Sequence, residues 1–117
     1  MNINERSRNT AKILIDIGAI NFSLVTPFRL SSGFLSPSYI DCRKIIAYPS
    51  AFKSITDMMI DTIKSDMVSQ SPNYIIGGET AGIPFGAAIA EKMGLPLSYV
   101  RKKSKDYGKN KFCLLYT

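Results

Sequence analysis

The sequence predicts an α/β fold with a parallel βαβ core. The prediction rests first on residues 74–76, a short apolar run that is typical of a buried parallel strand. A glycine-rich turn follows, and residues 85–93 then have the pattern of a helix that Gly94 and Pro96 end. Because a second apolar run follows at 97–100, the two strands should pair in parallel through a right-handed crossover.

One helix and several short strands are expected before this core. Residues 5–18 carry an apolar stripe with helical period and end at a glycine, which predicts a helix. Residues 21–30 alternate apolar and polar residues and are interrupted by Pro27, which predicts two short extended pieces around a turn. Turn-forming serines and glycine come next, and residues 38–41 then predict a further strand.

A second helix is expected to begin at Tyr48-Pro49, because a proline in the first helical position lacks only an N–H that would be unpaired anyway. It is expected to end near Asp66. Its apolar residues recur at spacings of three and four; they are Phe52, Ile55, Met59, Ile63 and Met67. We interpret this stripe as packing surface and not as a cofactor site.

The glycine-rich turn is the first candidate for a binding site. Gly77, Gly78 and Gly82 allow either a positive φ or the close approach of a ligand. Free N–H groups and the positive end of a helix dipole would meet there, which suits a phosphate. Glu79 would repel a phosphate unless it faced a metal, a hydroxyl or a helix N-terminus. The turn matches neither dinucleotide nor P-loop fingerprints, so tight packing and a ligand site are equally consistent with it.

Positive charge is concentrated in residues 101–111. This segment contains six basic residues and one acidic residue, so it accounts for +5 of the net charge of +6. Gly108 and Asn110 favour a loop here, and residues 112–116 predict the beginning of another strand. The charge is therefore a local feature of one loop and not a property of the whole surface.

Composition excludes several classes of protein. The chain has 117 residues, 45% of them hydrophobic and 21% charged, which suits one soluble globular domain. The sequence contains no histidine, which excludes Ser-His-Asp and Cys-His nucleophile systems. Cys42 and Cys113 are expected to be reduced thiols of a cytoplasmic protein. We expect neither a signal peptide nor a membrane span.

Three segments, in this order and spacing, resemble orotate phosphoribosyltransferase, a type I phosphoribosyltransferase. They are SSGFLSPSYIDCRK at 31–44, GGETAGIPFGAAIAEKMGLP at 77–96 and YVRKKSKDYGKN at 99–110. The resemblance implies a partial type I fold in one domain over residues 1–117. Residues 1–45 would form the N-terminal helix and small hood strands, and residues 46–117 the parallel βαβ core with its basic loop.

The resemblance also implies an activity, the transfer of ribose 5-phosphate from phosphoribosyl diphosphate to orotate. The products would be orotidine 5′-phosphate and pyrophosphate, in de novo pyrimidine (UMP) biosynthesis. It implies Mg²⁺ as cofactor and a cytoplasmic homodimer whose loop 101–111 reaches the neighbouring subunit. Cleavage of the C1–O bond develops positive charge on the sugar and negative charge on pyrophosphate, so positioning and electrostatic stabilisation can supply catalysis without histidine.

The candidate site residues follow from the resemblance by position. Lys105 and Arg101 are expected to be catalytic, and together with Lys102 they match diphosphate-binding residues of the family's loop. Ser31, Ser32 and Gly33, together with Tyr39 and Ile40, match the orotate side. The other substrate-binding residues expected are Tyr107, Glu79, Thr80, Ala81 and Gly82. Arg43 is matched by position without an assigned role, and no protein metal ligand is expected.

The sequence departs from the family at three places. Tyr107 stands where many members have histidine, and a phenol is neutral near pH 7. Thr80-Ala81 stands where many have Tyr-Lys, so one cationic contact is absent. The acidic pair and Thr/Gly-rich cradle that hold the ribose hydroxyls and the 5-phosphate are also absent. We therefore expect a C-terminally truncated domain with little transferase activity alone.

Two other interpretations stay open. The basic loop with Tyr107 and Phe112 could make the chain a small nucleic-acid-binding module that contacts phosphates and stacks a base. The confinement of charge to one loop argues against nucleic acid as the partner. The chain could also be a non-catalytic paralogue that pairs with an intact subunit and donates its basic loop.

Overall fold

The computed structural model describes residues 1–67 and 69–103. Their contacts divide the chain into two compact units, Met1–Ile55 and a second that begins at Thr56, and each unit is described by itself. Across this described part of the chain, no helix combines the length and the apolar character that a membrane span requires. The assignment of residues 1–117 to one domain stays a prediction.

The first unit opens with helix α1 (Ile3–Asp16), which begins two residues before the predicted start. The early start has a local cause, a reciprocal cap between Asn2 and Glu5. The side chain of Asn2 accepts the Glu5 N–H at 2.9 Å, and the Glu5 carboxylate accepts the Asn2 N–H at 3.0 Å. The helix ends before Gly18, which has a φ of 72° and turns the chain into the first strand.

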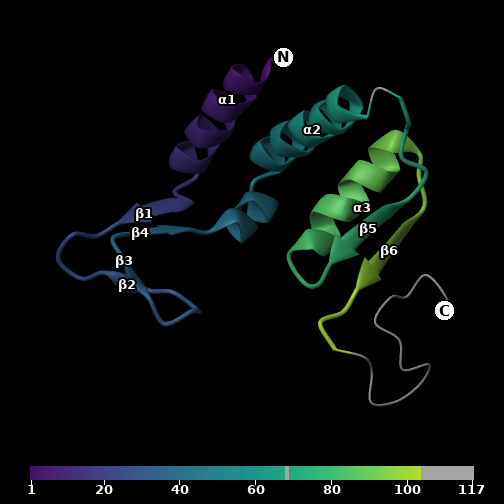
Figure 1. Ribbon diagram of the computed structural model, residues 1–117. Helices are drawn as coiled ribbons and strands as arrows, with labels where there is room; N and C mark the ends of the chain where they lie inside the picture. Colours follow the sequence, from purple (N-terminus) through teal and green to yellow (C-terminus); the bar gives the residue numbers. More distant parts are fainter. Residues whose placement is uncertain (68, 104–117) are drawn as a thin grey trace. The chain divides into compact units, whose positions relative to one another are not determined.

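Four short strands follow as two antiparallel pairs (Figure 1). Strand β1 (Ile20–Phe22) pairs with β4 (Ser38–Ile40), and β2 (Phe28–Arg29) pairs with β3 (Leu35–Ser36). The two extended pieces around Pro27 and the strand near 38–41 are thereby confirmed. Strand β3 is absent from the sequence-based expectation, because two residues are too few to show an alternating pattern.

A 3-10 helix (Cys42–Ala47) closes these strands and contributes the core residue Ile45. Ile45 and Ala19 are buried, and the Lys44 ammonium donates to the Gly18 carbonyl at 3.2 Å. The core is small, so hydrogen bonds hold the strands more than apolar burial does. Several apolar side chains are 75% to 93% exposed; they are Phe22, Leu24, Val25 and Phe34.

Helix α2 (Pro49–Asp66) begins and ends where the sequence predicts, and it runs across the boundary between the two units. Its buried residues are Ala51, Ile55 and Thr56. Met59 and Met67, by contrast, are 38% and 39% exposed. The predicted apolar stripe is therefore packing surface at Ile55 and only partly covered towards the end of the helix.

The second unit contains the predicted βαβ core (Figure 1). Strand β5 (Ile75–Gly78), helix α3 (Gly82–Met93) and strand β6 (Leu97–Val100) follow one another. The strands pair in parallel, with Ile75 opposite Leu97 and Gly78 opposite Val100. Helix α3 begins three residues before the predicted start, because Pro84 falls within its first turn, where a missing N–H costs no helical bond.

β5 and α3 meet at backbone distance around Gly77. A Cβ atom on Gly77 would lie 2.9 Å from the Gly82 carbonyl oxygen and 3.2 Å from the Ile83 Cα. A Cβ on Gly86, which is buried in α3, would lie 3.4 Å from the Gly77 Cα. The glycines of the turn have no positive φ; a φ of 67° occurs instead at Gly94, which ends α3 as predicted. Of the two possibilities considered for these glycines, a positive φ is therefore not the one used, and close packing against α3 explains Gly77.

This contact predicts that Gly77→Ala destabilises the protein. Since the new Cβ would overlap backbone atoms that cannot rotate away, the free energy of unfolding should fall by about 1–3 kcal/mol. Gly78→Ala is the matched control, because a Cβ there meets no atom within 4 Å. Urea unfolding of both variants measures the difference, and equal losses of stability would contradict the proposed close contact.

Candidate functional site

The carboxyl ends of β5 and β6 lead into the turn that precedes α3. The Glu79 N–H donates to the Val100 carbonyl at 3.0 Å, which continues the strand pairing by one residue. The Glu79–Thr80 peptide is cis, and Ala81 precedes α3 without a side-chain cap. In the first turn of α3, the Ile83 N–H donates to the Thr80 carbonyl at 3.2 Å and Pro84 has no N–H, so the Gly82 N–H is the one that can bind an external acceptor.

The Glu79 carboxylate has a partner that the sequence does not predict. Its Oε1 accepts the backbone N–H of Lys102 in a short hydrogen bond. The carboxylate thus faces an N–H of the chain that leaves β6, not the metal, hydroxyl or helix N-terminus considered from the sequence. This bond connects the glycine-rich turn to the beginning of the basic stretch.

Arg101 follows β6 directly and is half-buried. Its Nε atom is buried, and none of the residues in the described ranges offers it a hydrogen-bond partner. Lys102 and Lys103 are exposed. The other predicted loop residues, Lys105 and Tyr107, lie outside the described residues, as do 104–117 altogether.

In the first unit, the predicted serine loop forms the turn between β2 and β3. Gly33 has a φ of 90°, and its N–H donates to the Leu30 carbonyl at 2.9 Å. The Leu30 N–H donates to the Phe34 carbonyl at 2.8 Å, which closes the hairpin. Ser31 and Ser32 are exposed at its tip. Both hydroxyls are therefore placed on a short turn whose shape depends on Gly33.

Tyr39 and Ile40 lie on β4 and have different surroundings. The Tyr39 ring contacts the Phe28 ring, with centroids 5.9 Å apart and planes tilted by 35°. Ile40 is 53% exposed. The sequence does not identify Phe28 as the support of Tyr39, because β2 and β4 belong to different strand pairs and their contact forms only in the folded unit. This contact restricts the orientation of the Tyr39 ring.

Arg43 is held by its neighbour Asp41. Its Nε donates to Asp41 Oδ1 at 3.1 Å, and its backbone N–H donates to the same oxygen at 3.2 Å. The hydrogen bond and the charge of Asp41 raise the pKa of Arg43. We therefore assign Arg43 to the local structure where β4 enters the 3-10 helix.

The candidate residues fall into two sets, one in each unit. The set in the first unit comprises Ser31, Ser32, Gly33, Tyr39 and Ile40. The set in the second unit comprises Glu79, Thr80, Ala81, Gly82, Arg101 and Lys102. The structure brings the turn and the start of the basic stretch together through Glu79, while the binding roles of both sets stay predictions.

Comparison with known proteins identifies relatives over most of the chain. The orotate phosphoribosyltransferase of Roseobacter denitrificans is 49% identical over 106 residues, which cover 91% of this chain and 47% of that protein. The enzyme of Cereibacter sphaeroides is 50% identical over 106 residues, 46% of its length. The chain is a homologue of the orotate phosphoribosyltransferases. It spans about half the length of these curated relatives, and no protein-family model matches it.

Solved structures of phosphoribosyltransferases share the fold. The orotate phosphoribosyltransferase of Aeropyrum pernix aligns with a TM-score of 0.65 and 33% identity, over 79% of this chain and 52% of that chain. Leishmania donovani UMP synthase aligns with a TM-score of 0.63 and 28% identity, over 88% of this chain and 23% of that one. An adenine phosphoribosyltransferase, 21% identical, aligns with a TM-score of 0.63 and supports the fold alone. The predicted partial type I phosphoribosyltransferase fold is confirmed.

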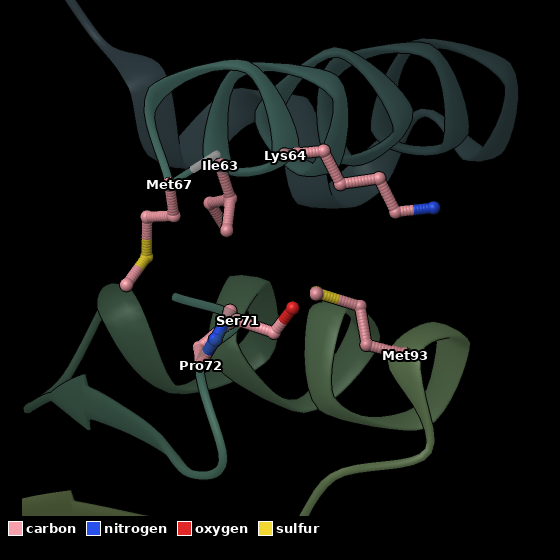
Figure 2. A pocket seen from close by; sticks show the side chains of 6 residues that line it. All are labelled: Ile63, Lys64, Met67, Ser71, Pro72 and Met93. Atoms are coloured by element: carbon pink, nitrogen blue, oxygen red, sulfur yellow. The ribbon is translucent and has the colours of Figure 1, made fainter. Parts of the chain in front are cut away.

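A cavity lies at the other end of α3 from the glycine-rich turn. Its volume is about 320 Å³, and it is lined by Ile63, Lys64, Met67, Ser71, Pro72 and Met93. Figure 2 shows Ile63 of α2, and Met67 just after this helix, on one side of this space and Met93 of α3 on the other. Since α3 rises 1.5 Å per residue, the cavity is separated from the turn by roughly 18 Å. Because this space lies beside Ile63 and Met67, the predicted stripe of α2 is incompletely packed there. We assign no ligand to the cavity.

The hairpin that carries Ser31 and Ser32 gives a second prediction. Gly33→Ala should destabilise the first unit by about 1–2 kcal/mol, because an L-residue with a Cβ is strained at this positive φ. Space is not the cause, since a Cβ at Gly33 meets no atom within 4 Å. Gly33→Asn should lose less stability, because asparagine tolerates positive φ better. Thermal unfolding of both variants tests this, and an alanine variant as stable as the parent would contradict it.

Proposed function

We propose that this chain forms the orotate-binding and diphosphate-binding parts of an orotate phosphoribosyltransferase site. The reaction would transfer ribose 5-phosphate from phosphoribosyl diphosphate to orotate in de novo pyrimidine biosynthesis. The observation that carries the proposal is that the uncapped start of α3 and Arg101 both follow the carboxyl ends of paired parallel strands. Ligands of open α/β sheets bind at this edge. The names of the curated relatives support the same reaction.

The chemistry needs a site that stabilises negative charge on the leaving pyrophosphate. Arg101 would act there as a planar cation that binds two oxygens at once. Its buried Nε, unpaired within residues 1–67 and 69–103, supports this role, because buried N–H groups in folded proteins are satisfied by a partner. The Gly82 N–H and the positive end of the α3 dipole would contribute fixed partial charges that need no rearrangement. Lys102 and Lys105 would add positive charge, with Lys105 catalytic and Tyr107 donating a hydrogen bond.

The orotate side would be formed by Ser31, Ser32 and Gly33, with Tyr39 and Ile40. Orotate is a planar anion with carbonyl, N–H and carboxylate groups. Serine hydroxyls and the N–H groups of a tight turn can bind such groups, and an aromatic ring held by Phe28 can stack on the pyrimidine. The exposed serines of the hairpin and the Tyr39 ring held by Phe28 support assignment of orotate to this unit.

Mg²⁺ is the cofactor that we propose for this site. Of the residues described, no group of three or more histidine, cysteine, aspartate or glutamate side chains could hold a metal ion. Mg²⁺ commonly keeps several waters and binds phosphate oxygens with few protein ligands. We therefore infer that it enters with phosphoribosyl diphosphate, where it would neutralise the diphosphate. A cytoplasmic homodimer that exchanges loop 101–111 between subunits belongs to the same proposal.

Titration calorimetry of the purified chain tests this function. Phosphoribosyl diphosphate in the presence of Mg²⁺, and orotate in a separate titration, should each bind saturably. Adenine is the control for non-specific stacking, because it is planar but lacks the carboxylate. Absence of both binding signals, together with steeply salt-dependent binding of RNA, would replace the proposal by the nucleic-acid-binding alternative.

Arg101→Gln should weaken binding of diphosphate selectively. Loss of a charge-assisted pair should cost about 1.5–3 kcal/mol, or roughly 10–100-fold in the dissociation constant. Lys103→Gln is the matched control, since it removes the same charge from an exposed neighbouring residue that no proposed contact involves. If both variants weakened binding equally, a general charge effect would explain the result and the specific role of Arg101 would be wrong.

A further inference from the structure

Glu79 makes two hydrogen bonds to the segment that leaves β6, and they lie on either side of Arg101. Its backbone N–H donates to the Val100 carbonyl at 3.0 Å, and its carboxylate accepts the Lys102 N–H. The residue before Arg101 and the residue after it are therefore both attached to Glu79.

Of these two hydrogen bonds, the one from the Lys102 N–H to the Glu79 carboxylate constrains the chain beyond β6 more strongly. The pairing of β5 and β6 ends at Gly78 and Val100, so the strand ladder does not hold Lys102. A hydrogen bond from a backbone N–H to a carboxylate is charge-assisted and roughly twice as strong as one between neutral groups. The negative charge of Glu79 also lies beside three consecutive cations, residues 101–103, whose mutual repulsion it reduces.

We propose that Glu79 is a positioning residue, which holds the backbone of Arg101 and Lys102 at the glycine-rich turn. Its carboxylate acts through the Lys102 N–H and makes no contact with substrate. The hydrogen bond itself follows from the structure, whereas its effect on ligand binding rests on the proposed function. The proposal also accounts for an acidic side chain in a turn that should bind an anion, because that charge is directed to the protein's own N–H.

A role as a magnesium ligand is the competing explanation, and glutamine separates the two. The side-chain carbonyl of Glu79→Gln can still accept the Lys102 N–H, although it carries no charge to bind a metal. Glu79→Ala removes both capacities. Positioning therefore predicts partial rescue by glutamine, whereas metal binding predicts that glutamine and alanine behave alike.

The first test follows the Lys102 amide in the ¹⁵N-labelled full chain by NMR. Solvent exchange of this amide should become about tenfold faster in Glu79→Ala, with an upfield shift of its proton, because a charge-assisted bond is lost. Glu79→Gln should exchange at an intermediate rate. Glu91→Ala is the control, since it removes an exposed carboxylate elsewhere on the same unit and should leave the Lys102 amide unchanged. Unaltered exchange in Glu79→Ala would overturn the proposal.

The second test measures binding of pyrophosphate with and without Mg²⁺. Glu79→Ala should weaken binding about tenfold under both conditions, and Glu79→Gln should weaken it less. A loss seen only with Mg²⁺, and equal in both variants, would overturn the positioning role in favour of metal binding. If the unsubstituted chain bound no pyrophosphate, the proposed function would fail, while the amide exchange would still decide whether Glu79 holds Lys102.

Discussion

The second unit depends on one steric constraint, the absence of a side chain at Gly77. Because β5 and α3 approach to backbone distance there, the start of the helix lies directly behind the end of the strand. This approach determines where the Gly82 N–H at the start of α3 lies. The binding that we propose for the turn thus depends on the packing of Gly77 against α3, although Gly77 is not itself proposed to contact a ligand.

Backbone N–H groups, as well as charged side chains, determine the electrostatic environment of the turn in this unit. A carboxylate beside an anion site would ordinarily oppose binding, but the charge of Glu79 is directed to the Lys102 N–H. Arg101 lies between the two residues that Glu79 holds, and its buried Nε needs an acceptor that the described residues do not supply. An anion can therefore be attracted by groups whose positions are fixed before it arrives, which lowers the entropic cost of binding.

Local signals in the sequence were sufficient for the longer helices and the parallel strands, but not for the short strand β3, the 3-10 helix or the contacts between elements. Pro49, Gly94 and the apolar runs of β5 and β6 identified helix limits and parallel strands, because those signals act within a few residues. The turn glycines were harder to interpret, since composition does not reveal that only Gly77 meets the helix backbone. The motif resemblance named the candidate residues, but the partners of Glu79 and Tyr39 lie on other segments that only the folded chain brings close. Hydrophobic periodicity in the sequence does not identify partners of this kind.

The close contact at Gly77 also limits how this turn can change by mutation. Any larger residue there would displace the start of α3, and with it the Gly82 N–H that we propose as an anion contact, so it would impair both the packing and the proposed binding. Thr80, by contrast, is exposed and Ala81 makes no side-chain cap, so both can vary without moving the backbone. Substitutions at Thr80 and Ala81 could therefore change the ligand preference of the proposed site and still leave the Gly77 contact, and with it the fold, unchanged.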